Sequence, residues 1–164
     1  NPLEIAGTFR LGEGAIDRFA AVVTPGRAAF DDEVAVIAGR RGRRRLPDVR
    51  PVATLDDLAA AQHTVDDVTV PEPVSRWIVE LLEATRRHPR VRLGASTRGG
   101  LAVAGLARAM AVMRGRAFVV PDDLFALAVP APPHRGLVVD ADGSVAAGRD
   151  VVDECLQQVR PPTA

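Results

Sequence analysis

Two consecutive segments with apolar residues at helical spacing constrain the fold of this chain more than any other feature. The first follows residues 68–73, and the second runs from Ser96 to about Arg114. Recurrence every three or four residues puts such side chains on one face of a helix, and that face must be buried against another element. The two stripes consist of Val74, Trp77, Ile78, Leu81 and Leu82, and of Val103, Leu106, Ala107, Met110 and Met113. The chain is therefore expected to be mainly α and to form a bundle, with Trp77 and both methionines in its core.

Local signals predict where the helices of this bundle begin and end. Residues 86–94 contain a proline, which disfavours helix for the residue before it and so separates the two segments. Ser96 is a plausible N-cap for the second helix, and Gly115 is a natural stop. Pro121 fits the first position of another helix, since two acidic residues follow it in the first turn. A final helix is expected to carry Val151, Val152, Cys155, Leu156 and Val159.

The first third of the chain has a different character. A short helix is predicted to carry Ile16 and Phe19, and the apolar run of residues 20–23 suits a buried strand. Acidic residues open a further helix at residues 30–40. Glycine, proline and arginine then dominate residues 39–53, which indicates a linker or an exposed loop.

Two weaker signals complete the outline. Thr54 and Asp57 have the spacing of a capping box ahead of a helix. Residues 137–147 are expected to form a small hairpin around Asp142 and Gly143. The predicted architecture is thus a piece of α/β structure, a basic connection and a bundle of four or five helices.

Composition excludes several kinds of chemistry. All 21 basic residues are arginines, so a phosphate loop with its lysine and Schiff-base catalysis are both excluded within this chain. The 21 acidic residues balance them, which argues against a general binder of nucleic acid or membrane surfaces. No run of about 18 apolar residues and no signal peptide is visible, and the single Cys155 suits a reducing compartment. We expect a cytoplasmic protein.

Arg98 is the most informative candidate for binding, because it lies among small residues at a predicted helix start. Backbone N–H groups and the positive end of the helix dipole favour a phosphate there. The alternative is a surface arginine beside a tight helix contact, with Gly99 and Gly100 present for packing. The sequence leaves both interpretations open.

The remaining candidates have more ordinary interpretations. Arg18 at the end of a short helix could form a surface ion pair. The arginine run of residues 40–45 could bind nucleic acid, but a solvated loop is favoured, because no aromatic residues are interleaved for stacking. The three histidines, His63, His88 and His134, have no metal-ligand spacing, so no metal site is expected. Cys155 lies on an apolar stripe and is interpreted as a small buried hydrophobe.

Several stretches, taken in order, resemble the C-terminal part of the MoxR-type AAA+ ATPases. They are "NPLEIAGTF…AIDRF", the long stretch from "VPEPVSRW" to "VVPDDLFALAV", and "PPHRG". The resemblance covers roughly residues 1 to 136 and is most specific in "ATRRHPRVRLGASTRGG…GRAFVVPDD". It implies a helical AAA+ lid bundle preceded by the C-terminal end of an α/β P-loop core, with residues 1–52 in the core and 53–164 in the lid.

The resemblance also assigns roles to three residues. Asn1 matches the sensor 1 asparagine, which helps to orient the attacking water. Arg18 of "DRF" matches the arginine finger, which reaches the nucleotide of a neighbouring subunit. Arg98 of "GASTR" matches the sensor 2 arginine at the start of a lid helix. This chemistry suits arginine, which makes fixed bidentate contacts to phosphate.

The implied parent is an ATPase that uses ATP and Mg²⁺ and forms a homo-oligomeric ring, expected to be a hexamer. Its expected work is chaperone-like remodelling or maturation of partner proteins, sometimes with a von Willebrand factor A-type protein. The chain is interpreted as a fragment that lacks Walker A and B, binds no cofactor by itself and is inactive alone. The rival interpretation is a non-enzymatic helical binding module whose arginine-rich loop contacts nucleic acid or protein. A GxxxxGK[ST] segment about 100 residues upstream of Asn1 would favour the ATPase.

Overall fold

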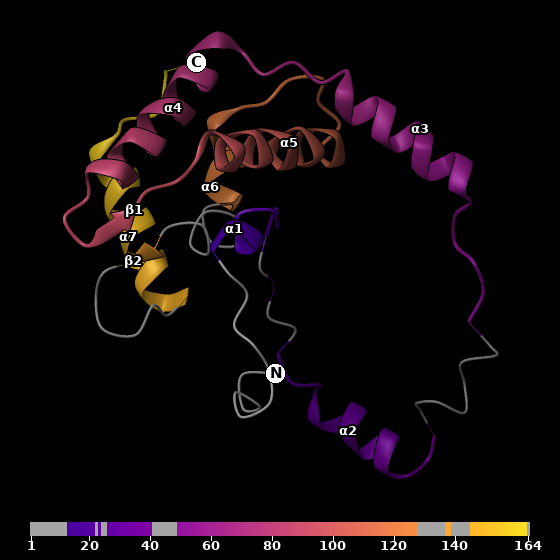
Figure 1. Ribbon diagram of the computed structural model, residues 1–164. Helices are drawn as coiled ribbons and strands as arrows, with labels where there is room; N and C mark the ends of the chain where they lie inside the picture. The colour runs from indigo at the N-terminus through magenta and orange to yellow at the C-terminus, as the bar shows by residue number, and fades with distance from the viewer. Residues whose placement is uncertain are drawn as a thin grey trace. The chain divides into compact units, whose positions relative to one another are not determined.

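The computed structural model describes residues 13–21, 23, 26–40, 49–127, 137–138 and 145–163, and most of these are helical (Figure 1). The chain divides into two compact units. One comprises Asn1–Val22 and Thr64–Ala164, and the other comprises Val23–His63. The domain boundary between residues 52 and 53 stays a prediction.

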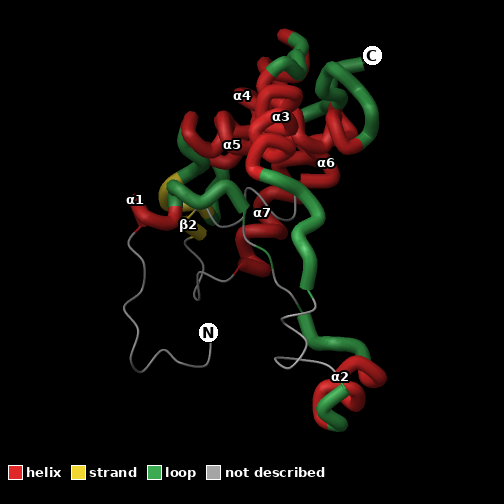
Figure 2. Tube along the Cα trace, turned by 90° about the vertical axis from the view of Figure 1, so that its right-hand side faces the viewer, coloured by secondary structure: helices red, strands yellow, loops and turns green. Residues whose placement is uncertain are grey.

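Four helices form the bundle of the larger unit: α4 (Glu72–Arg87), α5 (Thr97–Met113), α6 (Pro121–Leu127) and α7 (Val145–Gln158). Helix α4 contacts both α5 and α7, and α6 packs on α5. Figure 2 shows these helices gathered together. The expected mainly α fold with a helical bundle is therefore confirmed.

The core of the bundle combines residues of both predicted stripes with residues outside them. Its buried members include Val74, Trp77, Ile78, Ala107, Ala111, Val119, Leu124 and Leu127. Met110 is partly buried against this cluster. Met113 is 80% exposed, so the prediction of two core methionines was wrong for this residue. Met113 is the last residue of α5, where the helix ends and the bundle offers it no partner face.

The helix ends match the local signals. Ser96 precedes α5 with an extended backbone, and its Oγ accepts a hydrogen bond from the backbone N–H of Gly99 at 3.1 Å. Gly115 follows α5 with a φ of 70°, in the left-handed region that glycine occupies without strain. Pro121 is the first residue of α6.

A two-stranded antiparallel sheet replaces the predicted hairpin. Strand β1 (Val91–Leu93) pairs with β2 (Leu137–Val138), with Val91 opposite Val138. The hairpin prediction was wrong, because residues 145–147 begin α7 instead of returning as a strand. Asp142 and Gly143, the predicted turn, lie outside the described residues.

The N-terminal end of the larger unit is only partly as expected. Helix α1 (Glu13–Ile16) is short and ends before Phe19, which is 55% exposed. The described residues of the predicted strand at 20–23 do not form one. A strand is held by hydrogen bonds to a neighbouring strand, and the described residues offer no such neighbour at this position.

The smaller unit contains α2 (Phe30–Ile37) and most of α3 (Leu55–Asp66). Neither helix has a buried residue. The capping box of α3 is confirmed: the backbone N–H of Thr54 donates to Asp57 Oδ2 at 2.8 Å, and the N–H of Asp57 donates to Thr54 Oγ1 at 3.1 Å. The hydrogen bonds that the backbone N–H and the hydroxyl of Thr54 donate to the Asp57 carboxylate lower the pKa of Asp57. Of the arginine run at 40–45, only Arg40 lies within the described residues.

Candidate functional site

The N-terminus of α5 presents Arg98 to solvent. Arg98 is the second residue of the helix, directly after the Ser96 cap and Thr97, and its side chain is 63% exposed. The first turn of a helix leaves backbone N–H groups without intrahelical acceptors and carries the positive end of the helix dipole. An exposed guanidinium at this place is suited to an anion.

The loop that leads into α5 is fixed to α4. The backbone N–H of Ala95 donates to Thr85 Oγ1 at 3.0 Å, and Arg86 Nε donates to the carbonyl of Ala95 at 2.9 Å. A Cβ atom on Gly94 would lie 2.4 Å from the Cα of Arg86, so only glycine fits there. The start of α5, and with it Arg98, is thereby held in a defined position.

The glycines around Arg98 serve packing. Gly99 and Gly100 are both buried. A Cβ atom on Gly100 would lie 2.8 Å from Leu82 Cδ1, so this glycine lets α5 approach α4 closely. The packing alternative therefore explains Gly100, and the exposed group available to a ligand is the Arg98 side chain itself.

Asp17 connects the start of α5 to the segment that carries Arg18. Ser96 Oγ donates a hydrogen bond to Asp17 Oδ1 at 2.9 Å, and Arg98 Nη1 lies 3.5 Å from Asp17 Oδ2. Arg18 is exposed, and its backbone N–H donates to the carbonyl of Ala15 at 3.1 Å, in the turn after α1. The structure thus brings the Arg18 segment next to Arg98. Asn1 lies outside the described residues.

The contact made by Asp17 was not found by sequence reasoning. Asp17 and Ser96 are 79 residues apart, and no local pattern connects them. The available signal was the type of residue: the Asp17 carboxylate next to Arg18, and the Ser96 hydroxyl close in sequence to the Arg98 guanidinium. Such residue types indicate complementary charge, but they do not identify which residues are in contact.

Asp123 is a second carboxylate that sequence reasoning did not single out beyond its place in the first turn of α6. It is fully buried and is hydrogen-bonded by Arg114 Nη1 at 2.9 Å and by Arg116 Nη2 at 2.6 Å. Its other oxygen accepts from Arg116 Nη1 and from the backbone N–H of Val120. These bonds connect the end of α5 to the start of α6, so the cluster is structural.

The expectation that His88 is structural is also confirmed. His88 is buried, its Nε2 lies 2.9 Å from Glu154 Oε2, and its Nδ1 accepts from the backbone N–H of Arg90 at 3.2 Å. The Arg90 side chain pairs with the same carboxylate. Glu154 therefore ties α7 to the loop after α4. His63 lies on the exposed surface of α3, and His134 is outside the described residues.

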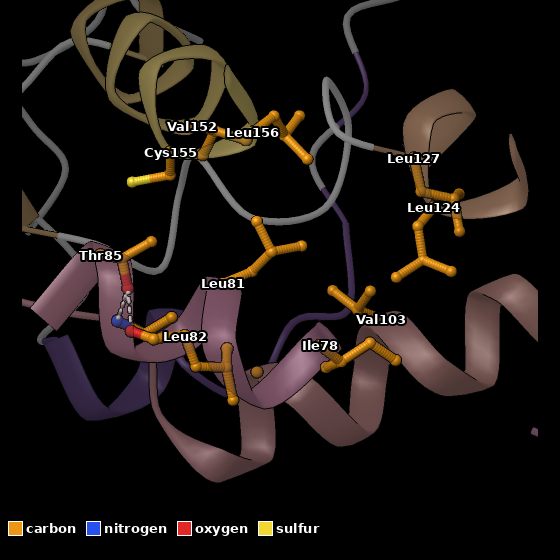
Figure 3. Close-up of a pocket in the computed structure, with 12 residues that line it drawn as sticks. Ile78, Leu81, Leu82, Thr85, Val103, Leu124, Leu127, Val152, Cys155 and Leu156 are labelled. Carbon is orange, nitrogen blue, oxygen red and sulfur yellow. Dashed lines mark hydrogen bonds between the residues drawn. The ribbon is translucent and has the colours of Figure 1, made fainter. Parts of the chain in front are cut away.

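An apolar cavity of about 60 Å³ lies within the bundle (Figure 3). Its lining comes from α4, α5, α6 and α7, with Leu81, Val103, Leu124 and Val152 among the labelled side chains. Cys155 also lines it and is 1% exposed, as expected of a small buried hydrophobe. Burial raises the pKa of its thiol, and the charge of Glu154 adds to this effect. The described residues that line the cavity are apolar apart from Thr85, and none of them is charged.

Among the described residues, no group of three or more His, Cys, Asp or Glu residues is placed to hold a metal ion. No helix in the described part of the chain is long and apolar enough to cross a membrane.

Comparison with known proteins gives concordant matches. The model of the AAA lid domain family matches residues 83–155, which include β1, α5, α6 and much of α7. The chain is 32% identical over 163 residues to YeaC of Bacillus subtilis, an uncharacterised protein, and 28% identical over 172 residues to the chaperone MoxR1 of Mycobacterium tuberculosis. These alignments cover 99% of this chain but 51% and 45% of the two relatives, so the chain spans about half of their length.

A solved structure agrees with these matches. The crystal structure of a candidate ATPase from Cytophaga hutchinsonii superposes with a TM-score of 0.82 at 25% identity, over 99% of this chain and 52% of that one. The AAA lid match and the MoxR relative name the same family as the "DRF" and "GASTR" motifs. Together these matches support a MoxR-type AAA+ C-terminal region, as the motifs predict.

Proposed function

We propose that this chain supplies two arginines to the nucleotide sites of a ring-forming ATPase that remodels or matures partner proteins. The proposal rests on the arrangement of residues at the start of α5. There Ser96 caps the helix, Arg98 is 63% exposed in its first turn, and the segment bearing Arg18 lies alongside through Asp17. An exposed guanidinium fixed at a helix N-terminus is a phosphate ligand by its chemistry.

Each residue has a distinct role in this proposal. Arg98 acts as the sensor 2 arginine and contacts the phosphates of ATP. Arg18 acts as the arginine finger and stabilises charge on the phosphoryl group bound by a neighbouring subunit. Asn1 acts as the sensor 1 asparagine and orients the attacking water.

The donor groups of this chain fit the phosphates of a nucleotide but not its metal. Arg98 and the amides of the first turn of α5 offer positive groups to an anion, whereas the described residues form no carboxylate cluster for Mg²⁺. Magnesium would therefore be held with the nucleotide by the P-loop region of the parent, where it neutralises phosphate charge. Since this chain has no lysine for a phosphate loop, we expect it not to hydrolyse ATP alone.

The partners in this proposal follow from the family. We propose a homo-oligomeric ring, with a hexamer as the expected size, because an arginine finger is useful only when a neighbouring subunit presents a nucleotide to it. Chaperone-like work is supported by the MoxR1 relative, which is named a chaperone. A von Willebrand factor A-type partner is part of the same proposal. The cytoplasm is the compartment we propose, since the single cysteine suits reducing conditions.

The test is the ATP turnover of the full-length parent with Arg98→Ala. We expect a loss of about tenfold or more, because one charge-assisted contact contributes about 1.5–3 kcal/mol. Arg76→Ala is the matched control. Arg76 is an exposed arginine on α4 that pairs with Glu72 at 2.8 Å. Wild-type turnover with Arg98→Ala, in a ring that still assembles, would remove Arg98 from the site.

A further inference from the structure

The contacts of Asp17 give this carboxylate a part in nucleotide binding. Its side chain is 24% exposed and faces two residues at the start of α5. One oxygen accepts a hydrogen bond from Ser96 Oγ at 2.9 Å, and the other lies 3.5 Å from Arg98 Nη1. Asp17 therefore touches the cap of the helix and the arginine proposed to bind phosphate.

The two contacts differ in strength. The hydrogen bond from Ser96 has a normal length, whereas charge-assisted N–H···O contacts of arginine are typically about 2.7–2.9 Å. At 3.5 Å, and with Arg98 63% exposed, the ion pair is loose. A phosphate that approaches Arg98 can therefore replace Asp17 as the partner of the guanidinium, which leaves Asp17 with the hydrogen bond from Ser96 but without its contact to Arg98.

Because Asp17 is next to Arg18 in the chain, replacement of Asp17 by a phosphate at Arg98 also affects the segment that carries Arg18. Asp17 directly precedes Arg18, and the two share the turn that follows α1. While Asp17 holds Arg98, the Arg18 segment is drawn toward the start of α5. A phosphate bound to Arg98 would face the Asp17 carboxylate, and two anions close together repel each other.

We propose that Asp17 is a positioning residue that competes with the nucleotide phosphate for Arg98 and so couples phosphate binding to the placement of the Arg18 segment. This inference rests on the proposed role of Arg98. Without nucleotide, the Asp17 carboxylate is the counter-ion of Arg98. With nucleotide, the phosphate takes its place and the Asp17–Arg98 ion pair is lost. Because the two contacts exclude each other, removal of the Asp17 charge must tighten phosphate binding.

The test is a double-mutant cycle on the affinity of the full-length ring for a fluorescent, non-hydrolysable ATP analogue. Asp17→Asn removes the charge but keeps an oxygen that accepts from Ser96. We expect it to lower the Kd about 1.5- to 5-fold, the range that double-mutant cycles give for exposed ion pairs. In the Arg98→Ala background the same change should leave the Kd unaltered. Glu72→Gln is the matched control, since it removes the charge of an exposed acid that pairs with Arg76 on α4, and it should leave the Kd unaltered.

The outcomes separate this inference from the proposed function. An equal effect of Asp17→Asn with and without Arg98 would mean a general effect of charge on ATP, and it would overturn the competition. An unchanged or higher Kd for Asp17→Asn, in a ring where Arg98→Ala weakens binding, would overturn it as well. If Arg98→Ala itself leaves the Kd unchanged, the proposed role of Arg98 fails, and the competition fails with it.

Discussion

The replacement Asp123→Asn tests how the bundle holds α5 and α6 together. Asp123 is fully buried and accepts four hydrogen bonds, from Arg114 at 2.9 Å, from Arg116 at 2.6 and 2.9 Å, and from the backbone N–H of Val120 at 3.0 Å. An asparagine keeps the shape but turns an NH₂ group toward donors. Removal of one partner of a buried ion pair costs about 3–5 kcal/mol. Both arginines are partly exposed and can be hydrated again, so we expect a loss of about 2–3 kcal/mol.

The assay is urea unfolding followed by Trp77 fluorescence. Trp77 is the single tryptophan, is 1% exposed, and lies with its ring 5.4 Å from that of Phe125 in α6, so it reports on the docking of this helix. Asp122→Asn is the matched control, since Asp122 is the exposed acid beside Asp123 in the first turn of α6. An equal shift in the unfolding midpoint for both variants would refute the structural role of Asp123.

The difference in stability between the wild type and Asp123→Asn is predicted to depend on pH. Burial raises the pKa of Asp123, but the hydrogen bonds from Arg116 and Val120 and the charges of Arg116 and Arg114 outweigh it, and the pKa lies below its ordinary value of 3.8. A lowered pKa in the folded state means that the carboxylate stabilises the fold above pH 3.8 and loses this effect as the pH falls further. The difference in unfolding free energy between wild type and Asp123→Asn should thus be full at neutral pH and shrink below pH 3.8. A difference that stays constant down to pH 2 would contradict this.

Two further predictions concern packing. Gly94→Ala should destabilise the chain by about 1–3 kcal/mol, because the new Cβ would lie 2.4 Å from the Cα of Arg86. Gly105→Ala on α5, where a Cβ meets no atom within 4 Å, should stabilise the chain by up to about 1 kcal/mol. Urea unfolding measures both changes, and a change of the same sign for the two variants would contradict this packing. The thiol of Cys155, buried and with a raised pKa, should react with a thiol reagent about tenfold or more slowly in the native chain than in urea. Equal rates would show that the packing of α7 against α4 does not bury the thiol.

Features that depend on neighbouring residues could be predicted from the sequence. The Ser96 cap spans three residues, as does the capping box of Thr54 and Asp57, and the stop at Gly115 depends on its own φ angle. The stripe of α4 was equally readable, because helical spacing alone determines which side chains share a face. The fold class and the starts of α3, α5 and α6 follow from such local signals, whereas α7 begins within the predicted hairpin.

Features that depend on distant partners could not be predicted. β1 pairs with β2 across more than 40 residues, and the apolar run at 20–23 resembles a strand by composition but has no neighbour among the described residues. Met113 continues the stripe of α5 by spacing, yet the packing ends before it. The glycines near Arg98 illustrate the same limit for the site, since close helix packing and close approach of an anion require the same small residues. Only the 2.8 Å approach to Leu82 distinguishes the two cases at Gly100.

The measurement that most directly tests the central proposal is the ATP turnover of mixed rings of the full-length parent. One subunit type carries Arg18→Ala and keeps its own nucleotide site. The other is mutated in the acidic Walker B residue of the parent and keeps Arg18. Each is expected to be inactive alone, since a finger supplied by a neighbour accelerates phosphoryl transfer by about 10³–10⁵. Mixing should restore partial turnover, because some sites then combine an intact nucleotide pocket with an intact Arg18. Rings shown to contain both subunit types but without any turnover would contradict the account and leave Arg18 as an ordinary surface residue.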